Sequence, residues 1–267
     1  MTSLEVMICT YGAAGIRRVA GHSHPRVEGV RYLVGWQMPE GEEDADVPEA
    51  LLRDDFIILR HASSGLSKNR NYLLTRATAP LLLVSDDDVD YTAEGLRGII
   101  DAFDRYPHCD LLTFRYETSL PWKTYPAEAR PIWQRLRRYY PNSIEIAFRR
   151  EAVQGRIAFD ERFGIKALFP AGEEDIFIED CRRAGLKGSF IPFTICRHEG
   201  STTFEREENL DRYIPVKAAV NVRIFPYSWP FRMIIHTLRE ARRRHSLRFV
   251  PHYVNLWLGG VKNYRSL

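Results

Sequence analysis

Short runs of apolar residues recur along the first two hundred positions, separated by polar turns or by amphipathic stretches. Short apolar runs between turn-forming residues are typical of buried strands, whereas apolar residues three and four apart indicate helices. Because strands and helices alternate, we predict an α/β fold with a mostly parallel central sheet flanked by helices on both faces. The predicted strands are residues 5–9, 31–36, 56–59, 81–84, 111–116, 143–148 and 189–195, and the predicted helices are residues 66–77, 96–103 and 176–184.

The pattern changes from Pro226 onward. Four apolar residues there share one helical face, and a basic run follows them. One interpretation is that this face packs on the rest of the protein; the other is that it lies on an anionic membrane surface, and both can hold. We therefore predict a catalytic domain over residues 1–225 and a basic amphipathic helical extension over residues 226–267. The face consists of Phe231, Ile234, Ile235 and Leu238, and the basic run of Arg239, Arg242, Arg243, Arg244 and His245.

Three adjacent carboxylates, Asp86, Asp87 and Asp88, come directly after the strand at 81–84. Like charges in a row repel one another, so a bound cation would hold them together. Oxygen ligands of this kind suit Mg²⁺ or Mn²⁺, which are commonly shared with substrate phosphates. In open α/β sheets, ligands bind beyond the carboxyl ends of the strands, where this cluster falls. The alternative is an acidic turn on the surface.

A second acidic cluster, GEED at residues 172–175, lies at the start of a predicted helix, and His198 follows the last predicted strand. Carboxylates at a helix N-terminus are stabilised by the helix dipole, so each could serve as a simple cap. The order of the three elements, an Asp triplet, a helix-start Glu-Asp pair and a histidine, favours a functional site.

Composition and cysteine usage narrow the class of protein. The formal net charge is only +3, and the four cysteines are far apart and form no CxxC pair. This pattern suggests neither a disulfide framework nor a zinc site and fits a reducing, cytoplasmic setting. The N-terminus lacks the pattern of a signal peptide, and no apolar stretch is long enough to span a membrane. We expect a soluble protein or one peripheral to the inner face of the membrane.

Four ordered motifs resemble those of family 2 glycosyltransferases with the GT-A fold, which transfer sugars from nucleotide-diphosphate sugars. They are LSKNRN at 66–71, LLVSDDD at 82–88, GEED at 172–175 and RHEGS at 197–201, and the resemblance spans roughly residues 4–203. It implies an inverting, metal-dependent hexosyltransferase of the Asp-x-Asp type. Its implied cofactor is Mn²⁺ or Mg²⁺.

The resemblance also implies roles for individual residues. Asp175 matches the catalytic base, and Glu174 would help to hold the acceptor hydroxyl. Asp86, Asp88 and His198 would bind the metal. The nucleotide sugar would contact Thr10, Tyr11, Arg70, Asp86 and Asp87.

The substrates are less closely defined. The resemblance implies a UDP-sugar donor and a glycan or lipid-linked glycan acceptor in surface polysaccharide biosynthesis. Many relatives carry an aspartate after the second strand that reads uracil, whereas this chain has Gly35, Trp36 and Gln37 there, which leaves the base open. Nucleic acid is not an expected partner, because the basic run is short and no recognition module accompanies it.

Two alternatives and one ambiguous segment remain. The fold could serve as a non-catalytic sugar-nucleotide-binding module, or the triplet could belong to a phosphatase of the haloacid dehalogenase type. The segment 121–141 is rich in aromatic residues, which could form a sugar-binding lip or a partly buried loop. Its aromatic residues are Trp122, Tyr125, Trp133, Tyr139 and Tyr140.

Overall fold

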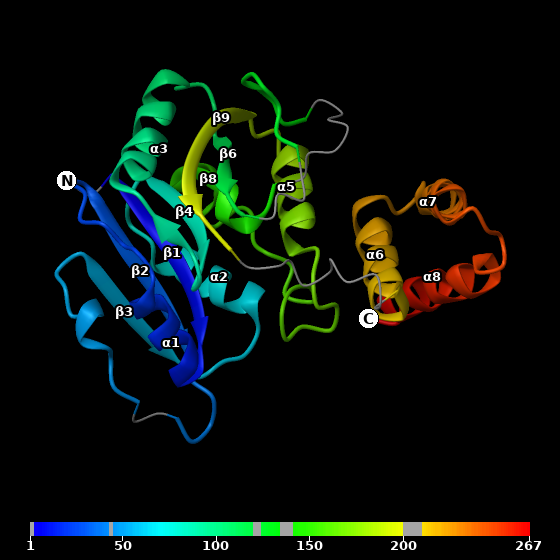
Figure 1. The fold of residues 1–267 in the computed structure, drawn as a ribbon, viewed down its shortest axis with the longest axis horizontal. Coiled ribbons are helices and arrows are strands. Elements are labelled where there is room, and N and C mark those ends of the chain that lie inside the picture. Colours follow the sequence, from blue (N-terminus) through cyan, green and yellow to red (C-terminus); the bar gives the residue numbers. More distant parts are fainter. Residues whose placement is uncertain (1–2, 43–44, 120–123, 134–140, 200–209) are drawn as a thin grey trace.

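The computed structural model describes residues 3–42, 45–119, 124–133, 141–199 and 210–267. Its centre is a nine-stranded sheet in the order β3-β2-β1-β4-β8-β6-β9-β5, with β7 paired to β9 (Figure 1). The strands are β1 (Leu4–Tyr11), β2 (Val30–Gln37), β3 (Phe56–His61), β4 (Leu81–Asp86), β5 (Asp90–Tyr91), β6 (Leu111–Glu117), β7 (Arg130–Pro131), β8 (Ile146–Arg149) and β9 (Gly188–Arg197).

The first four strands are parallel, which confirms that part of the prediction. Their register aligns Tyr11 with Gln37 and Cys9 with Asp86, so the carboxyl ends of β1, β2 and β4 meet at one edge of the sheet. The other half is mixed: β8 is antiparallel to both β4 and β6, whereas β6 and β9 are parallel. The sheet thus presents the Asp triplet and the end of β1 together.

Helices cover both faces of the sheet, as predicted. Alternate residues of β1 point to opposite faces: Val6 belongs to one apolar cluster and Met7 to the other. The first cluster includes residues of α1 and α3, and the second includes residues of α2 and α5. These helices are α1 (Gly12–Gly21), α2 (Leu66–Arg76), α3 (Ala93–Arg105) and α5 (Glu173–Arg183), and the short helices are η1 (Glu49–Leu51), η2 (Ser143–Glu145) and α4 (Arg150–Val153).

Two local predictions need correction. The segment after β1 forms helix α1, which is absent from the predicted helices. The predicted strand at 143–148 begins as the 3-10 helix η2, and only Ile146–Arg149 pairs in the sheet.

The C-terminal part of the chain forms three helices, α6 (Leu210–Ile224), α7 (Trp229–Arg244) and α8 (Val250–Arg265). They lie at one end of the molecule, and α6 is nearest to the sheet domain (Figure 1). One side of α6 packs against Phe163, Phe169 and Ile176 of the sheet domain. Its other side packs against Tyr253 and Trp257 of α8. Helix α6 therefore belongs to both apolar clusters, and the predicted boundary at residue 225 falls between α6 and α7.

The apolar face of α7 does not pack as one interpretation held. Phe231, Ile234, Ile235 and Leu238 are all among the exposed large apolar side chains. The idea that this face packs on the rest of the protein is wrong, because α6 makes that contact instead. Among the described residues, no helix combines the length and apolar character needed to cross a membrane.

Candidate active site

The central carboxylate of the triplet, Asp87, is held by residues from β1 and α1. Thr10 Oγ1 donates to Asp87 Oδ2 at 2.8 Å, and Arg18 donates through Nε to Oδ1 at 2.8 Å and through Nη2 to Oδ2 at 2.9 Å. The hydrogen bond to Asp87 raises the pKa of Arg18. A side chain at Gly15 would place its Cβ 2.2 Å from Thr10 Oγ1, so a glycine is needed for this close approach. The negative charge of Asp87 is thus balanced by Arg18 within the protein.

Arg70, on α2, joins the two acidic motifs. Its side chain is 0% exposed; Nη2 donates to Asp86 Oδ1 at 3.0 Å and Nη1 donates to Glu173 Oε1 at 2.9 Å. Glu174 Oε1 lies 3.9 Å from Arg70 Nη1. Burial disfavours the charged guanidinium, but the surrounding carboxylates outweigh it and raise the pKa of Arg70. Ser143 Oγ donates to Asp86 Oδ2 at 2.9 Å, which fixes the second oxygen of that carboxylate.

The first turn of α5 presents three carboxylates in different environments. Glu173 is buried, the side chain of Glu174 is 24% exposed, and Asp175 is exposed. Burial and the neighbouring carboxylate of Glu173 raise the pKa of Glu174 to about 8, although Arg70 opposes the shift. A carboxyl that titrates near neutral pH can exchange a proton with a bound hydroxyl, and such perturbed groups are common in functional sites.

Asp88 and His198 form the third part of the site. His198 Nε2 lies 3.2 Å from Asp88 Oδ1. The hydrogen bond with Asp88, together with its charge, raises the pKa of His198 against the effect of burial. Burial acts to raise the pKa of Asp88, but the interaction with His198 lowers it overall. This contact joins the segment that follows β4 to the segment that follows β9.

We tested whether this donor set suits a divalent ion. No group of three histidine, cysteine or acidic side chains is arranged to hold a metal within the part of the chain that the structure describes. Asp88 and His198 nevertheless supply one carboxylate and one imidazole side by side, and Mg²⁺ is usually bound through one or two carboxylates plus substrate phosphates and water. The residues fit an ion that shares its coordination with a diphosphate. Of the three predicted ligands, Asp86 is the one engaged by Arg70 and Ser143.

The remaining predicted contacts flank this cluster. Tyr11 lies at the end of β1, and Lys166 Nζ is 2.9 Å from its ring centroid. Gln37, which stands near the position of the missing aspartate, is buried and donates from Nε2 to Ser63 Oγ at 2.7 Å. The side chain of Gln37 is therefore engaged within the protein.

The described members of the aromatic segment are packed. Trp133 Nε1 donates to the carbonyl of Leu186 at 3.0 Å, and the ring of Tyr125 stacks on Phe190. Both contacts favour a partly buried loop for these two residues. Trp122, Tyr139 and Tyr140 lie outside the described residues.

Sequence reasoning missed three residues of the site: Arg18, Ser143 and Glu173. Arg18 lies on α1, a helix that was not predicted, and its position directly after β1 is the signal that could have identified it. Glu173 stood beside the predicted pair at a helix start. Ser143 carries no signal, because it meets Asp86 only through the fold.

The fold is similar to that of solved GT-A glycosyltransferases. This chain is similar to the crystal structure of S. aureus TarS residues 1–349, with a TM-score of 0.59 and 16% sequence identity. The alignment covers 83% of this chain and 65% of the TarS chain. The structure of the same TarS fragment in complex with UDP has a TM-score of 0.58 and 16% identity to this chain, and the alignment covers 82% of this chain and 65% of the TarS chain. Mannosyltransferase PcManGT from Pyrobaculum calidifontis, in complex with GDP-Man and Mn²⁺, gives 0.56 at 14% identity over 98% of this chain and 75% of that one.

The family comparison agrees with the fold. Residues 43–163 match the family described as glycosyl transferase family 2. No curated protein matches the chain. The chain spans about two thirds of the length of the TarS structure, 65% in the alignment. The family match and the fold both argue against the haloacid dehalogenase alternative.

Proposed function

We propose that this chain transfers a hexose from a nucleotide-diphosphate sugar, a UDP-sugar, to a hydroxyl of a glycan or lipid-linked glycan with inversion at the anomeric carbon. The observation that carries the proposal is the position of Arg70. Its guanidinium contacts Asp86 at the end of β4 and Glu173 at the start of α5. The motif predicted to hold the diphosphate and the motif predicted to hold the base therefore lie on either side of one side chain.

The donor side of the site follows from the ends of β1 and β4. Thr10 and Tyr11 would hold the nucleoside, and the Asp triplet would hold the diphosphate through a metal ion. Asp88 and His198, with Asp86 as the third predicted ligand, would bind Mn²⁺ or Mg²⁺, which when bound stabilises negative charge on the leaving diphosphate. Arg70 was predicted to meet the diphosphate directly; its complete burial favours a role in positioning Asp86 and Glu173.

The acceptor side follows from the start of α5. The acceptor oxygen attacks the anomeric carbon from the face opposite the diphosphate, a new carbon–oxygen bond forms, and the bond to the diphosphate breaks with its electron pair. Asp175 takes the proton of the acceptor hydroxyl as general base. Glu174, with its raised pKa, is placed to hydrogen-bond that hydroxyl.

Titration calorimetry tests the proposal. Nucleoside diphosphates of uracil and guanine are titrated with Mn²⁺ and with chelator, since the similar structures include complexes with UDP and with GDP-Man. Wild type should bind UDP only with metal, and Asp88→Ala should lose that binding. The exposed Asp104 of α3 provides the matched control, because Asp104→Ala removes a carboxylate far from the site. Asp175→Asn should bind as wild type yet fail to transfer sugar.

Two results would contradict the proposal. Binding of no nucleotide under any condition would remove its physical basis, and the triplet would then be an acidic turn. Nucleotide binding without sugar transfer or donor hydrolysis, against a panel of UDP-sugars, would support the non-catalytic binding module instead.

The setting is also part of the proposal. A lipid-linked acceptor for a surface polysaccharide would place the protein at the inner face of a membrane. The basic C-terminal helices support this.

A further inference from the structure

Helix α7 exposes a continuous apolar face. The fractional exposures are 69% for Phe231, 51% for Ile234, 47% for Ile235 and 62% for Leu238. Their spacing of three and four residues places them on one side of the helix, whereas Met233 and His236, which contact the cluster around Trp257 of α8, lie on the other side. Contiguous exposed apolar surface of this kind marks an interaction site in a monomeric protein. We refer to these four residues as the α7 face.

Arginines border the α7 face. Arg239 follows Ile235 by four residues and Arg242 follows Leu238 by four, so each lies one turn beyond an apolar residue of the face. Both are exposed, and neither side chain makes a hydrogen bond or ion pair within the described ranges of the chain. Arg243 and Arg244 instead pair with Glu240, the single acidic residue between Pro226 and Leu267.

The apolar face and its bordering arginines together indicate which kind of partner binds to α7. An apolar stripe with unpaired guanidinium groups along its border matches an anionic lipid surface, which offers hydrocarbon below a layer of negative phosphates. A second copy of the same helix would bring the arginines of both copies together, and like charges at an interface oppose association. Tyr227, which is 94% exposed just before α7, adds an aromatic side chain of the type found at membrane surfaces.

We propose that α7 docks this protein on anionic membranes, with the α7 face in the headgroup boundary and Arg239 and Arg242 on lipid phosphates. Only the presence of an acceptor at that membrane rests on the proposed function. The docking itself depends on α7 alone.

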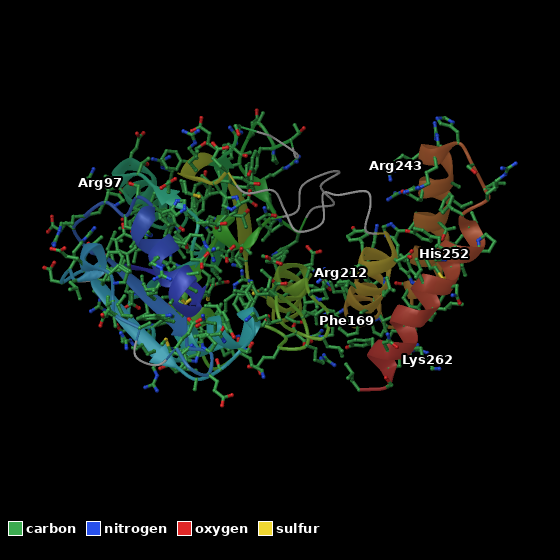
Figure 2. All side chains as sticks on the ribbon, turned by 60° about the horizontal axis from the view of Figure 1, so that its bottom comes forward. Arg97, Phe169, Arg212, Arg243, His252 and Lys262 are labelled. Carbon is green, nitrogen blue, oxygen red and sulfur yellow. The ribbon has the colours of Figure 1, made fainter. Side chains whose placement is uncertain are left out.

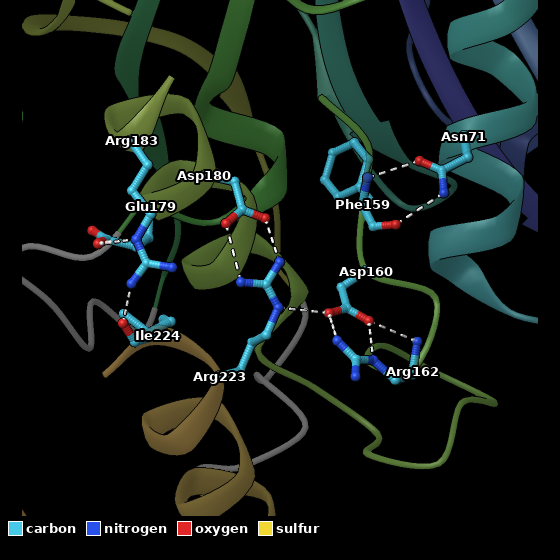
Figure 3. A network of polar contacts seen from close by, with 9 residues as sticks. All are labelled: Asn71, Phe159, Asp160, Arg162, Glu179, Asp180, Arg183, Arg223 and Ile224. Carbon is cyan, nitrogen blue, oxygen red and sulfur yellow. Dashed lines mark hydrogen bonds and ion pairs between the residues drawn. The ribbon is translucent and has the colours of Figure 1, made fainter. Parts of the chain in front are cut away.

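Contacts between α6 and the sheet domain connect the C-terminal helices to the candidate active site. Arg223 of α6 donates from Nε to Asp160 at 2.9 Å and from Nη2 to Asp180 at 2.7 Å, as Figure 3 shows. Asp180 belongs to α5, the helix that begins with the acidic motif. Phe163 and Ile176 pack against α6 beside this network. A membrane-bound α7 would therefore hold the start of α5 in a fixed relation to the membrane.

Vesicle flotation tests the docking with the full chain. Wild type should float with vesicles of phosphatidylcholine and phosphatidylglycerol, and much less with phosphatidylcholine alone or in high salt. Each arginine near an anionic surface contributes about fivefold in partitioning. Arg239→Ser/Arg242→Ser should therefore lose about 25-fold, and Leu238→Glu should lose about tenfold or more.

The chain offers matched controls. Arg97→Ser/Arg105→Ser removes two exposed arginines from α3, and Figure 2 shows Arg97 and Arg243 at opposite ends of the molecule. Leu52→Glu changes a leucine that is 69% exposed outside the C-terminal helices. Both controls should float as wild type. The proposal is overturned if the controls lose as much binding as the α7 variants, or if wild type fails to float.

A labelled variant gives an independent readout. All four native cysteines are buried, so Ile234→Cys can be labelled selectively with an environment-sensitive dye. Its emission should shift to the blue with anionic vesicles, whereas a dye at Leu52→Cys should not respond. A protein that dimerises through α7 and ignores vesicles would show the face to be an interface between copies and would overturn the proposal. Nucleotide titration of each variant separates this result from failure of the proposed function, because docking requires no catalysis.

Discussion

At the scale of single residues, each carboxylate of the Asp triplet contacts a different basic side chain of the protein itself. Arg70 contacts the first carboxylate, Arg18 the second and His198 the third. The two arginines therefore relieve part of the repulsion that the sequence predicts among adjacent carboxylates, before any metal binds. The metal hypothesis consequently depends most on Asp88, because its partner His198 is itself a good ligand.

Arg70 and Arg18 should differ strongly in their effect on stability. Arg70→Met leaves Glu173 buried without its cation, and removing one partner of a buried ion pair costs about 3–5 kcal/mol. Arg18→Met breaks a pair whose arginine is 51% exposed, and such surface pairs contribute only about 0–1 kcal/mol. Urea unfolding of the two variants measures both losses. Equal losses would contradict the view that Arg70 is the structural link between the motifs.

Glu174 should make the stability depend on pH. Its folded-state pKa of about 8 lies above the ordinary value, so the folded protein holds a proton that the unfolded chain has released between about pH 4.5 and 8. Stability from this group is thus present below that range and is lost as the pH rises through it. Glu174→Gln stays neutral, so its melting temperature should rise relative to wild type between pH 5 and about pH 8.5. A constant difference across this range would show that Glu174 is ionised throughout.

At the scale of elements, the ends of α5 allow a matched comparison. Gly172 at its start has φ +94° and a Cβ there would lie 2.4 Å from Val220 Cγ2; Gly185 just after its end has φ +81° with nothing within 4 Å. Gly185→Ala should cost about 1–2 kcal/mol from backbone strain alone. Gly172→Ala should cost roughly 1–3 kcal/mol more, because it overpacks the contact with α6.

A double variant checks the cause. If overpacking is responsible, Gly172→Ala/Val220→Ala should recover part of the additional loss in a double-mutant cycle. No recovery would mean that the cost comes from the backbone alone. Chemical denaturation measures all four free energies of unfolding.

Strands β1 and β4 could be predicted from the sequence because they are mostly apolar runs buried on both faces. Helix α1 could not, because among its buried residues only Ile16 and Val19 have large side chains, and the segment contains three glycines. The antiparallel insertion of β8 between β4 and β6 is also invisible in a pattern, since strand order leaves no local signal. The amphipathic pattern of α7 was found, but a pattern does not say what covers a face.

Some contacts of the candidate site could also be predicted from the sequence, whereas others could not. Asp88 and His198 were grouped through resemblance to a family, and they lie together in the fold. The bond between Arg18 and Asp87 joins residues far apart in the sequence, and no spacing rule relates them. Motif spacing thus identifies chemical groups at strand ends, whereas the partners that tune them depend on tertiary packing.

At the scale of the whole molecule, α6 makes the two parts one cooperative unit. It packs with Phe163 and Ile176 on one side and with Trp257 on the other. Because neither apolar cluster can be exposed without disturbing α6, we expect a single calorimetric unfolding transition in which the calorimetric and van't Hoff enthalpies agree. Two resolved transitions in the wild type would show that the C-terminal helices fold independently.

Arg223→Met should separate the two parts. The substitution removes the hydrogen bonds from α6 to Asp160 and Asp180, which are 8% and 22% exposed, so the carboxylates lose a partner at the junction. We expect the C-terminal helices to unfold first, which broadens the transition and raises the ratio of calorimetric to van't Hoff enthalpy above one. Arg182→Met is the control, because Arg182 lies on α5 but, among the residues that the structure describes, pairs only with Glu179 of the same helix. If both variants keep a single transition, the apolar packing of α6 alone couples the active-site domain to the proposed docking helix.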